Sequence, residues 1–349
     1  MSTPPSSPGV RAALLHAFSV WNLLILLVLL VALFAVLKPD TFLTAFTFRS
    51  MANSRSINAL LALAVMIPLA ANQFDLSVAS VLGIAQVLAN GLQTQQHLPW
   101  QLAVLLVLAL GAVVGLINGL LVTRARINSF IATLGTGTVL LGLNQWYTGG
   151  RQVVGALPAE FTAISSMVPG LGVPAPLLYV LVVGLVLWVV FDYLPLGRYL
   201  YVIGDSPRAA QLSGVPTERY VTLAFVASGT LAALAGIMLQ VQLQVGQSTV
   251  GQELMLPAFT GGLLGATAIR PGRPNVWGTV LAVAVLAVAV AGLSQLGAPF
   301  YVEPLFNGGM PVLAVGLAAA TQRRRESRAA AAEAAARAAP AVPRPATTS

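Results

Sequence analysis

The feature that most constrains this chain is a succession of long apolar stretches separated by short polar segments. A helix rises about 1.5 Å per residue, so about 20 apolar residues cross the hydrocarbon core of a bilayer. Ten stretches qualify, at residues 19–37, 57–71, 76–92, 101–122, 129–147, 176–194, 220–243, 255–269, 276–297 and 303–320. We predict an all-α polytopic membrane protein with about ten transmembrane helices. The second, third and eighth stretches are short, which indicates bent or interrupted helices inside a bundle.

The charge content supports lipid as the main solvent. Only 8% of the 349 residues are charged and 57% are hydrophobic, whereas soluble domains carry about 25% charged residues. The net charge of +8 does not indicate a nucleic-acid site, because no basic patch is interleaved with stacking aromatic residues.

The arginines predict the orientation, since cytoplasmic loops of membrane proteins are enriched in Lys and Arg. With the N-terminus inside, ten spans place both termini in the cytoplasm. The arginine-bearing segments then also lie inside; they contain Arg124 and Arg126, then Arg198, Arg208 and Arg219, then Arg270 and Arg273, and finally Arg323, Arg324, Arg325 and Arg328.

This orientation divides the chain into three parts. Residues 1–18 form a cytoplasmic N-terminal segment, residues 19–320 the transmembrane domain, and residues 321–349 a cytoplasmic tail that we expect to be disordered. The first apolar stretch is interpreted as a retained span and not a removed signal peptide. Residues 38–56 fall outside in this scheme despite three basic residues, so we expect an interfacial or re-entrant stretch there. The Gly- and Pro-rich segment 148–175 is expected to be an external loop.

Several chemistries are excluded by what the sequence lacks. There is no cysteine and there are only two histidines, His16 and His97, so neither a metal site nor any other cofactor is expected. No phosphate-binding G-x-x-x-x-G-K-[ST] loop exists, so this chain does not bind and hydrolyse ATP in the usual manner. No G-x-S-x-G nucleophile motif is present either. We therefore do not expect an enzyme.

One acidic residue interrupts two apolar stretches. Asp75 lies in the polar string Asn72-Gln73-Phe74-Asp75-Leu76-Ser77. A charge at membrane depth is costly and suggests a functional site. Alternatively, Asp75 caps the helix that follows; we favour the cap, although both roles can coexist. Asn72, Asp75 and Ser77 are thus the candidates for a helix break or translocation pathway.

The loop 195–219 carries the signals of a short, capped helix. Pro195 to Arg198 end one span, Asp205 or Ser206 can cap a helix that Pro207 begins, and Gly214 stops it. This helix could be a docking knob for another protein or an ordinary interfacial helix. If the helix is a docking site, the candidate residues for coupling to the partner protein are Arg198, Asp205, Ala209, Ala210, Leu212 and Gly214.

Small residues recur within the fourth stretch. Gly111, Gly115 and Gly119 repeat every four residues, a pattern that lets another helix approach closely. We interpret it as packing within the chain and not as a dimer contact. Asn118 and Asn144 are interpreted as hydrogen-bonding groups between helices.

Four strings carry a resemblance to a known family. They are Gln73 to Ser80; Asn118-Gly119-Leu120-Leu121-Val122-Thr123 with Phe130 to Gly135; Gly197 to Gly204 with Ala209 to Val215; and Trp277-Gly278-Thr279. In this order they resemble the permeases of ribose/xylose/galactose-type ABC importers over most of residues 57–320.

The resemblance implies a fold, partners and a location. The fold would be like that of type II ABC importer permeases, with two permeases per complex, either identical or homologous. An ABC ATPase subunit would dock on the loop helix 205–214, and an external or periplasmic binding protein would deliver a sugar. The chain would span the bacterial inner (cytoplasmic) membrane and perform no bond chemistry itself.

Departures from the family pattern leave alternatives open. Gln73 and Ala79 stand where the family has glycine, and residues 260–274 depart from its late glycine-rich stretch. The transported molecule could instead be a branched-chain amino acid or a nucleoside. An ion-coupled secondary transporter is a further alternative, with Asp75 as its coupling group.

Overall fold

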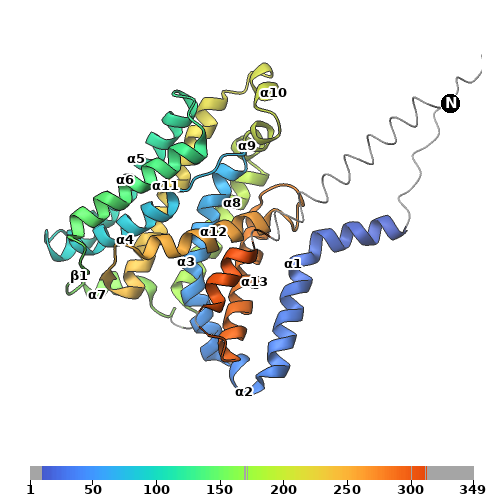
Figure 1. The fold of residues 1–349 in the computed structure, drawn as a ribbon, viewed down its shortest axis with the longest axis horizontal. Helices are drawn as coiled ribbons and strands as arrows, with labels where there is room; N and C mark the ends of the chain where they lie inside the picture. Colours follow the sequence, from blue (N-terminus) through green and yellow to red (C-terminus); the bar gives the residue numbers. More distant parts are fainter. Residues whose placement is uncertain (1–9, 169, 171, 300, 311, 313–349) are drawn as a thin grey trace, which may run out of the picture.

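The computed structural model describes residues 10–168, 170, 172–299, 301–310 and 312, with side chains from residue 20 onward (Figure 1). The long helices are α1 (Val10–Leu37), α3 (Ala45–Leu69), α4 (Val78–Thr94), α5 (Trp100–Thr123), α6 (Ser129–Thr148), α8 (Ala175–Asp192), α11 (Thr217–Leu243), α12 (Val250–Gly265) and α13 (Val276–Gln295). The short elements are α2 (Pro39–Phe42), β1 (Val153–Val154), α7 (Ala159–Thr162), η1 (Ala163–Ser165), α9 (Pro195–Asp205), α10 (Pro207–Leu212) and β2 (Val245–Gly246). Residues 302–310 are also helical.

The helices agree with the predicted all-α membrane protein. Within the described residues, six helices are long and apolar enough to cross a membrane; they are α1, α3, α5, α8, α11 and α13. α4 and α12 are shorter, at 17 and 16 residues, and α6 is less apolar. All ten predicted stretches contain helix, but residues 311 and 313–320 of the last one lie outside the described part. The described structure therefore does not fix the number of spans at ten.

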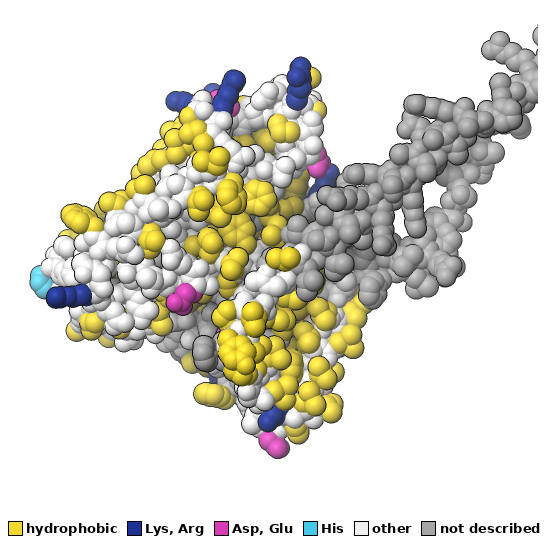
Figure 2. All heavy atoms as spheres, in the orientation of Figure 1, with side chains coloured by type: hydrophobic (Ala, Val, Ile, Leu, Met, Phe, Trp, Pro, Cys, Tyr) yellow, Lys and Arg dark blue, Asp and Glu magenta, His cyan; other side chains and the backbone are white. Residues whose placement is uncertain are grey.

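The helices differ widely in how much of their surface they bury. In the apolar windows of α3 and α1, 78% and 11% of residues are buried. α3 lies with α4 and α11 at the centre of the bundle, whereas α1 contacts mainly α13 (Figure 1). Hydrophobic side chains cover much of the flank visible in Figure 2. Val36 and Val139 are among the strongly exposed apolar residues of the protein. An apolar surface of this extent suits lipid as solvent.

The prediction of an interfacial or re-entrant stretch over residues 38–56 is wrong for residues 45–56, which belong to one continuous helix, α3. α2 occupies Pro39–Phe42, and α3 begins at Ala45 and runs for 25 residues, so the second span is neither short nor begun at residue 57. Polar residues lower the hydropathy of this half of α3, but their side chains have partners within the protein. Arg49 donates to the carbonyl of Gly172 at 3.0 Å, and Arg55 pairs with Glu303 at 2.9 Å.

The segment from Pro195 to Arg198 was also misinterpreted. α8 ends at Asp192, and Pro195 begins α9, an 11-residue helix that the sequence analysis missed. Proline suits the first turn of a helix because its missing N–H needs no partner there. At the other end of the bundle, β1 in the segment 148–175 pairs antiparallel with β2, with Val153 opposite Gly246. The predicted tail 321–349 lies outside the described residues.

Candidate functional site

A buried polar centre lies where the chain breaks between α3 and α4. α3 ends at Leu69 and α4 begins at Val78; Asn72, which is exposed, turns the chain with a positive φ of 56°. Asp75 and Ser77 are each only 1% exposed. Of the three residues predicted for this break, Asp75 and Ser77 therefore lie together inside the protein, and Asn72 lies at its surface.

The Asp75 carboxylate accepts three hydrogen bonds. One oxygen accepts from the Ser77 hydroxyl at 2.6 Å and from the Ser77 N–H at 3.1 Å. The other accepts from the Ser228 hydroxyl of α11 at 2.9 Å. The predicted cap is wrong in position, because Ser77 is the N-cap residue of α4. Asp75 instead holds the N–H of that N-cap residue and links the break to α11.

Two further helices join this centre. Asn118 of α5 donates to the Ser77 hydroxyl at 2.8 Å and accepts from Thr136 of α6 at 2.7 Å. The hydroxyl of Thr133 on α6 accepts from the N–H of Leu76 at 3.0 Å. Buried polar groups require such partners, because an unmade hydrogen bond in a low-dielectric interior is costly. The network therefore fixes α4, α5, α6 and α11 around the break.

The same break is in direct contact with α9. A Cβ at Gly204 would clash with the carbonyl oxygen of Ala70, and one at Gly197 would clash with the backbone of Phe191. Glycine at these two positions therefore lets α9 lie against the end of α8 and the end of α3. This contact connects the segment that precedes α10 with the chain that leads into Asp75.

The predicted loop helix exists as α10. The Ser206 hydroxyl accepts from the N–H of Ala209 at 3.3 Å and so caps it, and Gly214 ends it with a φ of +77° that favours glycine. Leu212 is 83% exposed, whereas Ala210 is fully buried.

The remaining predicted coupling residues lie on both sides of this cap. Ala209 is exposed on α10, and Asp205 is the last residue of α9. Arg198, near the start of α9, donates to the carbonyl of Tyr193. Asp205 and Ala209 thus lie close to Leu212 in the sequence, whereas Arg198 lies near the start of α9, away from α10.

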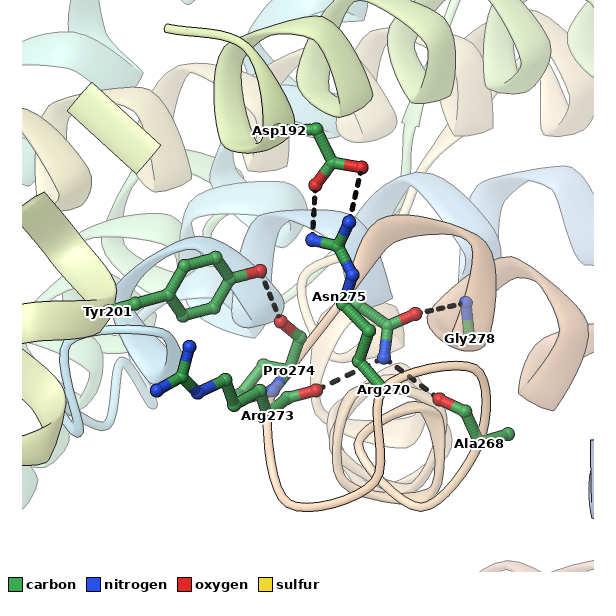
Figure 3. Close-up of polar contacts among 8 residues, drawn as sticks. All are labelled: Asp192, Tyr201, Ala268, Arg270, Arg273, Pro274, Asn275 and Gly278. Atoms are coloured by element: carbon green, nitrogen blue, oxygen red, sulfur yellow. Dashed lines mark hydrogen bonds and ion pairs between the residues drawn. The ribbon is translucent and has the colours of Figure 1, made fainter. Parts of the chain in front are cut away.

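The loop 266–275, which joins α12 to α13, is fastened to α8 and α9 (Figure 3). Arg270 bonds both carboxylate oxygens of Asp192, the last residue of α8, at 2.5 and 3.0 Å. Arg273 pairs with Asp205 at 2.7 Å. The Tyr201 hydroxyl donates to the carbonyl of Pro274 at 2.7 Å.

Tyr201 is held in its donating form. Burial raises the pKa of Tyr201 to about 12; nearby Arg270 and Arg273 lower it and Asp192 raises it further. A tyrosine with its ordinary pKa of about 10 is already protonated at neutral pH, and the raised pKa extends this donating form to more alkaline conditions. The Arg273 guanidinium lies 5.7 Å from the centre of the Tyr201 ring, within the range of a cation–π contact.

The predicted glycine stripe faces α11. Cβ atoms at Gly111 and Gly115 would clash with the carbonyl oxygens of Gly229 and Phe225, and one at Gly119 would lie 2.8 Å from the Cα of Thr222. The backbones of α5 and α11 therefore run in close contact at three positions over about two helical turns. Asn118 is on the same buried side of α5, so this contact also positions the side chain that reaches Ser77.

Within the described residues, no group of three or more His, Asp or Glu side chains is placed to hold a metal ion.

Comparison with known proteins assigns the chain to a family. The family described as "Branched-chain amino acid transport system / permease component" matches residues 48–315. The chain belongs to this family. The match begins within the first turns of α3 and so takes in the Asp75 centre, α9, α10 and the loop 266–275.

Curated relatives match the chain over most of their own length. The ribose import permease protein RbsC of Haemophilus influenzae is 30% identical over 293 residues, 83% of this chain and 90% of the relative. That of Bacillus subtilis is 32% identical over 289 residues, 83% and 89%. The autoinducer 2 import system permease protein LsrD of Escherichia coli O9:H4 is 31% identical over 261 residues, 73% and 78%. No solved structure matches the chain.

The permease's polar centre contains residues that sequence reasoning missed. Ser228 lies in an Ala- and Gly-rich run of α11, and its small polar side chain gave no periodic signal. The pairs Arg270–Asp192 and Arg273–Asp205 join residues 78 and 68 positions apart, so no local pattern could reveal them. In the sequence, these four residues stand out only because they are charged and lie outside or at the ends of the predicted spans.

Proposed function

We propose that this chain is the membrane-spanning permease subunit of an ATP-driven importer for a sugar. The observation that carries the proposal is the similarity to ribose import permeases over 83% of this chain and about 90% of theirs. The similarity runs through both structural sites described above. The chain itself carries no ATP-binding motif, so the ATPase would be a separate subunit.

The helix α10 is our candidate for the ATPase docking site. It is short, capped and attached directly to α9, and it presents Leu212 and Ala209 at the surface. An exposed leucine at the end of a small helix suits insertion into an apolar groove of a partner. Because α9 lies against Ala70, a movement of α10 would reach the chain that leads into Asp75.

A bundle of ten spans with both termini in the cytoplasm is part of the proposal. Supporting it, segments expected on one side contact each other. β1 pairs with β2, Arg49 bonds Gly172, and Thr41 bonds Gln295, all on the expected outer side.

On the expected inner side, Gly204 contacts Ala70 and Arg270 contacts Asp192. We also propose that the chain has the type II importer fold. A second permease copy or homologue and an external binding protein complete the assembly.

Co-purification from the native bacterial cell tests the assembly. A tagged chain, gently solubilised, should bring down an ATPase with a phosphate-binding loop and, in the presence of sugar, an external binding protein. Uptake by the reconstituted complex should be measured for pentoses and for branched-chain amino acids, because the family description names the latter. A clean preparation without ATPase that accumulates solute along an ion gradient would contradict the proposal.

Docking on α10 is tested by Leu212→Asp. A carboxylate placed in an apolar groove loses its hydration without gaining a partner, so ATPase recovery should fall about tenfold or more. Val154→Asp is the matched control, because Val154 is a similarly exposed apolar residue on β1. Ala210 is unsuitable for this test, since it is buried and a bulky residue there would disturb packing. Equal ATPase recovery with both variants would exclude α10 as the docking site.

A further inference from the structure

The loop 266–275 is built as one piece with the helices on either side of it. Asn275 is the N-cap of α13, where its side-chain oxygen accepts from the N–H of Gly278 at 2.8 Å. Its amide nitrogen donates to the carbonyls of Gly265 and Ala268, each at 3.0 Å. One buried side chain thus holds the end of α12, the loop and the start of α13 together. Figure 3 shows its contacts with Ala268 and Gly278.

The segment that faces this loop is equally continuous. Asp205 is the last residue of α9, and Ser206 ends α9 and caps α10. No flexible linker therefore separates Asp205 from the exposed Leu212 in this described segment. Because only Ser206 joins the two helices, we expect a displacement of α10 to move the Asp205 carboxylate.

The two ion pairs that hold the loop 266–275 to α9 and to α8 are largely exposed and contribute little to stability. The side chains of Arg273 and Asp205 are 54% and 59% exposed, and that of Arg270 is 48% exposed. Exposed pairs are worth about 0–1 kcal/mol each because water screens them and ordering the side chains costs entropy. Their geometry is nevertheless specific. Arg270 makes a bidentate contact with Asp192, and Arg273 pairs with Asp205. These two ion pairs flank the hydrogen bond from the buried Tyr201 hydroxyl to the Pro274 carbonyl.

We propose that the loop 266–275 is a transmission strap that passes movements of α9 and α10 to α12 and α13. Arg273 and Asp205 form its outer link, and Arg270 with Asp192 anchors it to α8. These are positioning residues: they do not touch the transported molecule, and they determine whether movement at α10 reaches the spans. This inference rests on the proposed docking of an ATPase at α10.

The test compares single charge reversals with their combination in the reconstituted complex. Asp205→Arg and Arg273→Asp each place like charges face to face, and the double variant restores an opposite pair. Solute uptake per ATP hydrolysed should fall about fivefold or more in each single variant and recover in the double variant. Arg124→Asp serves as the control, because Arg124 is exposed on the loop after α5 and has no ion pair among the described residues.

The outcomes separate the strap from the proposed function. The strap proposal is overturned if a single charge reversal leaves uptake per ATP hydrolysed as high as in the unmodified protein. It is also overturned if the double variant does not regain that ratio. Failure of the unmodified chain to recruit any ATPase would instead overturn the proposed function. If the reversals prevent assembly, the neutral variants Asp205→Asn and Arg273→Gln are used. They should lower the same ratio while ATPase recovery stays unchanged, and an unchanged ratio overturns the strap.

Discussion

Asp75 shows how a single charged residue can be kept inside a bundle of this composition. Its carboxylate has two oxygens that only accept, and the structure surrounds them with donors from Ser77 and Ser228. The donors are uncharged, so the site fixes chain geometry without forming an ion pair. The residue thereby links the α3–α4 break to α11, which is one of the most buried helices.

Substitutions at Asp75 should separate hydrogen bonding from charge. Asp75→Asn keeps an acceptor oxygen and should cost about 1 kcal/mol of stability, with uptake largely retained. Asp75→Leu leaves the Ser77 and Ser228 donors without an acceptor and should cost about 3 kcal/mol or more, with uptake lost. Thermal stability in detergent and uptake in proteoliposomes measure both effects. Loss of uptake in a stable Asp75→Asn variant would show that the charge itself is required, as in an ion-coupled carrier.

At the scale of elements, the α5–α11 contact determines how closely two spans approach. In a bilayer, lipid chains are as apolar as leucine, so helices associate through close packing and not through burial from water. Gly111 and Gly229 allow carbonyl groups of one helix to touch the backbone of the other. The polar contact from Asn118 to Ser77 depends on this approach.

Two glycine-to-alanine variants test this contact with opposite expected signs. A methyl group at Gly115 clashes with the carbonyl of Phe225, so Gly115→Ala should destabilise the protein by about 1–3 kcal/mol. At Gly142 on α6, a Cβ meets no described atom within 4 Å, so Gly142→Ala should be neutral or stabilising by up to about 1 kcal/mol through helix propensity. The midpoint of thermal aggregation, followed by size-exclusion chromatography, measures both. Equal effects would mean that α5 and α11 are not in backbone contact.

At the scale of the whole molecule, two ends of the bundle are held together by different means. The end with α9 and α10 uses ion pairs and the Asn275 network. The other end uses the β1–β2 pair and the contact of Arg49 with Gly172. We expect these ends to face the cytoplasm and the exterior, respectively.

Because the chain has no cysteine, single introduced cysteines can report this topology directly. Ala125→Cys and Ser213→Cys should react with a membrane-impermeant maleimide only after the inner face is exposed. Gln95→Cys and Ala159→Cys should react in intact cells or spheroplasts. All four positions are exposed, so reactivity depends on the side of the membrane. Labelling of Ser213→Cys from outside would reverse the proposed orientation.

The sequence by itself determined the class of protein and the position of most helices. The side chains of apolar stretches of about 20 residues require lipid or a deep core around them. A helix can lie there because it hydrogen-bonds its own backbone groups. The capped helix α10 was likewise predictable, since Ser206, Pro207 and Gly214 act through contacts with their immediate neighbours in the chain. The start of α3 was not, because Arg49 and Arg55 find their partners at Gly172 and Glu303, far along the chain.

Only the tertiary structure decided which polar residues meet. Ser228 reaches Asp75 across 153 positions, and Arg273 reaches Asp205 across 68. Hydrophobic patterning reports the solvent that a segment prefers, and that preference is a property of the segment alone. A hydrogen bond or an ion pair depends on two side chains at a distance that the packing of whole helices sets. The sequence therefore determined that this is a membrane permease, and the packing of its helices decided how the α10 end of the bundle is joined to its polar centre.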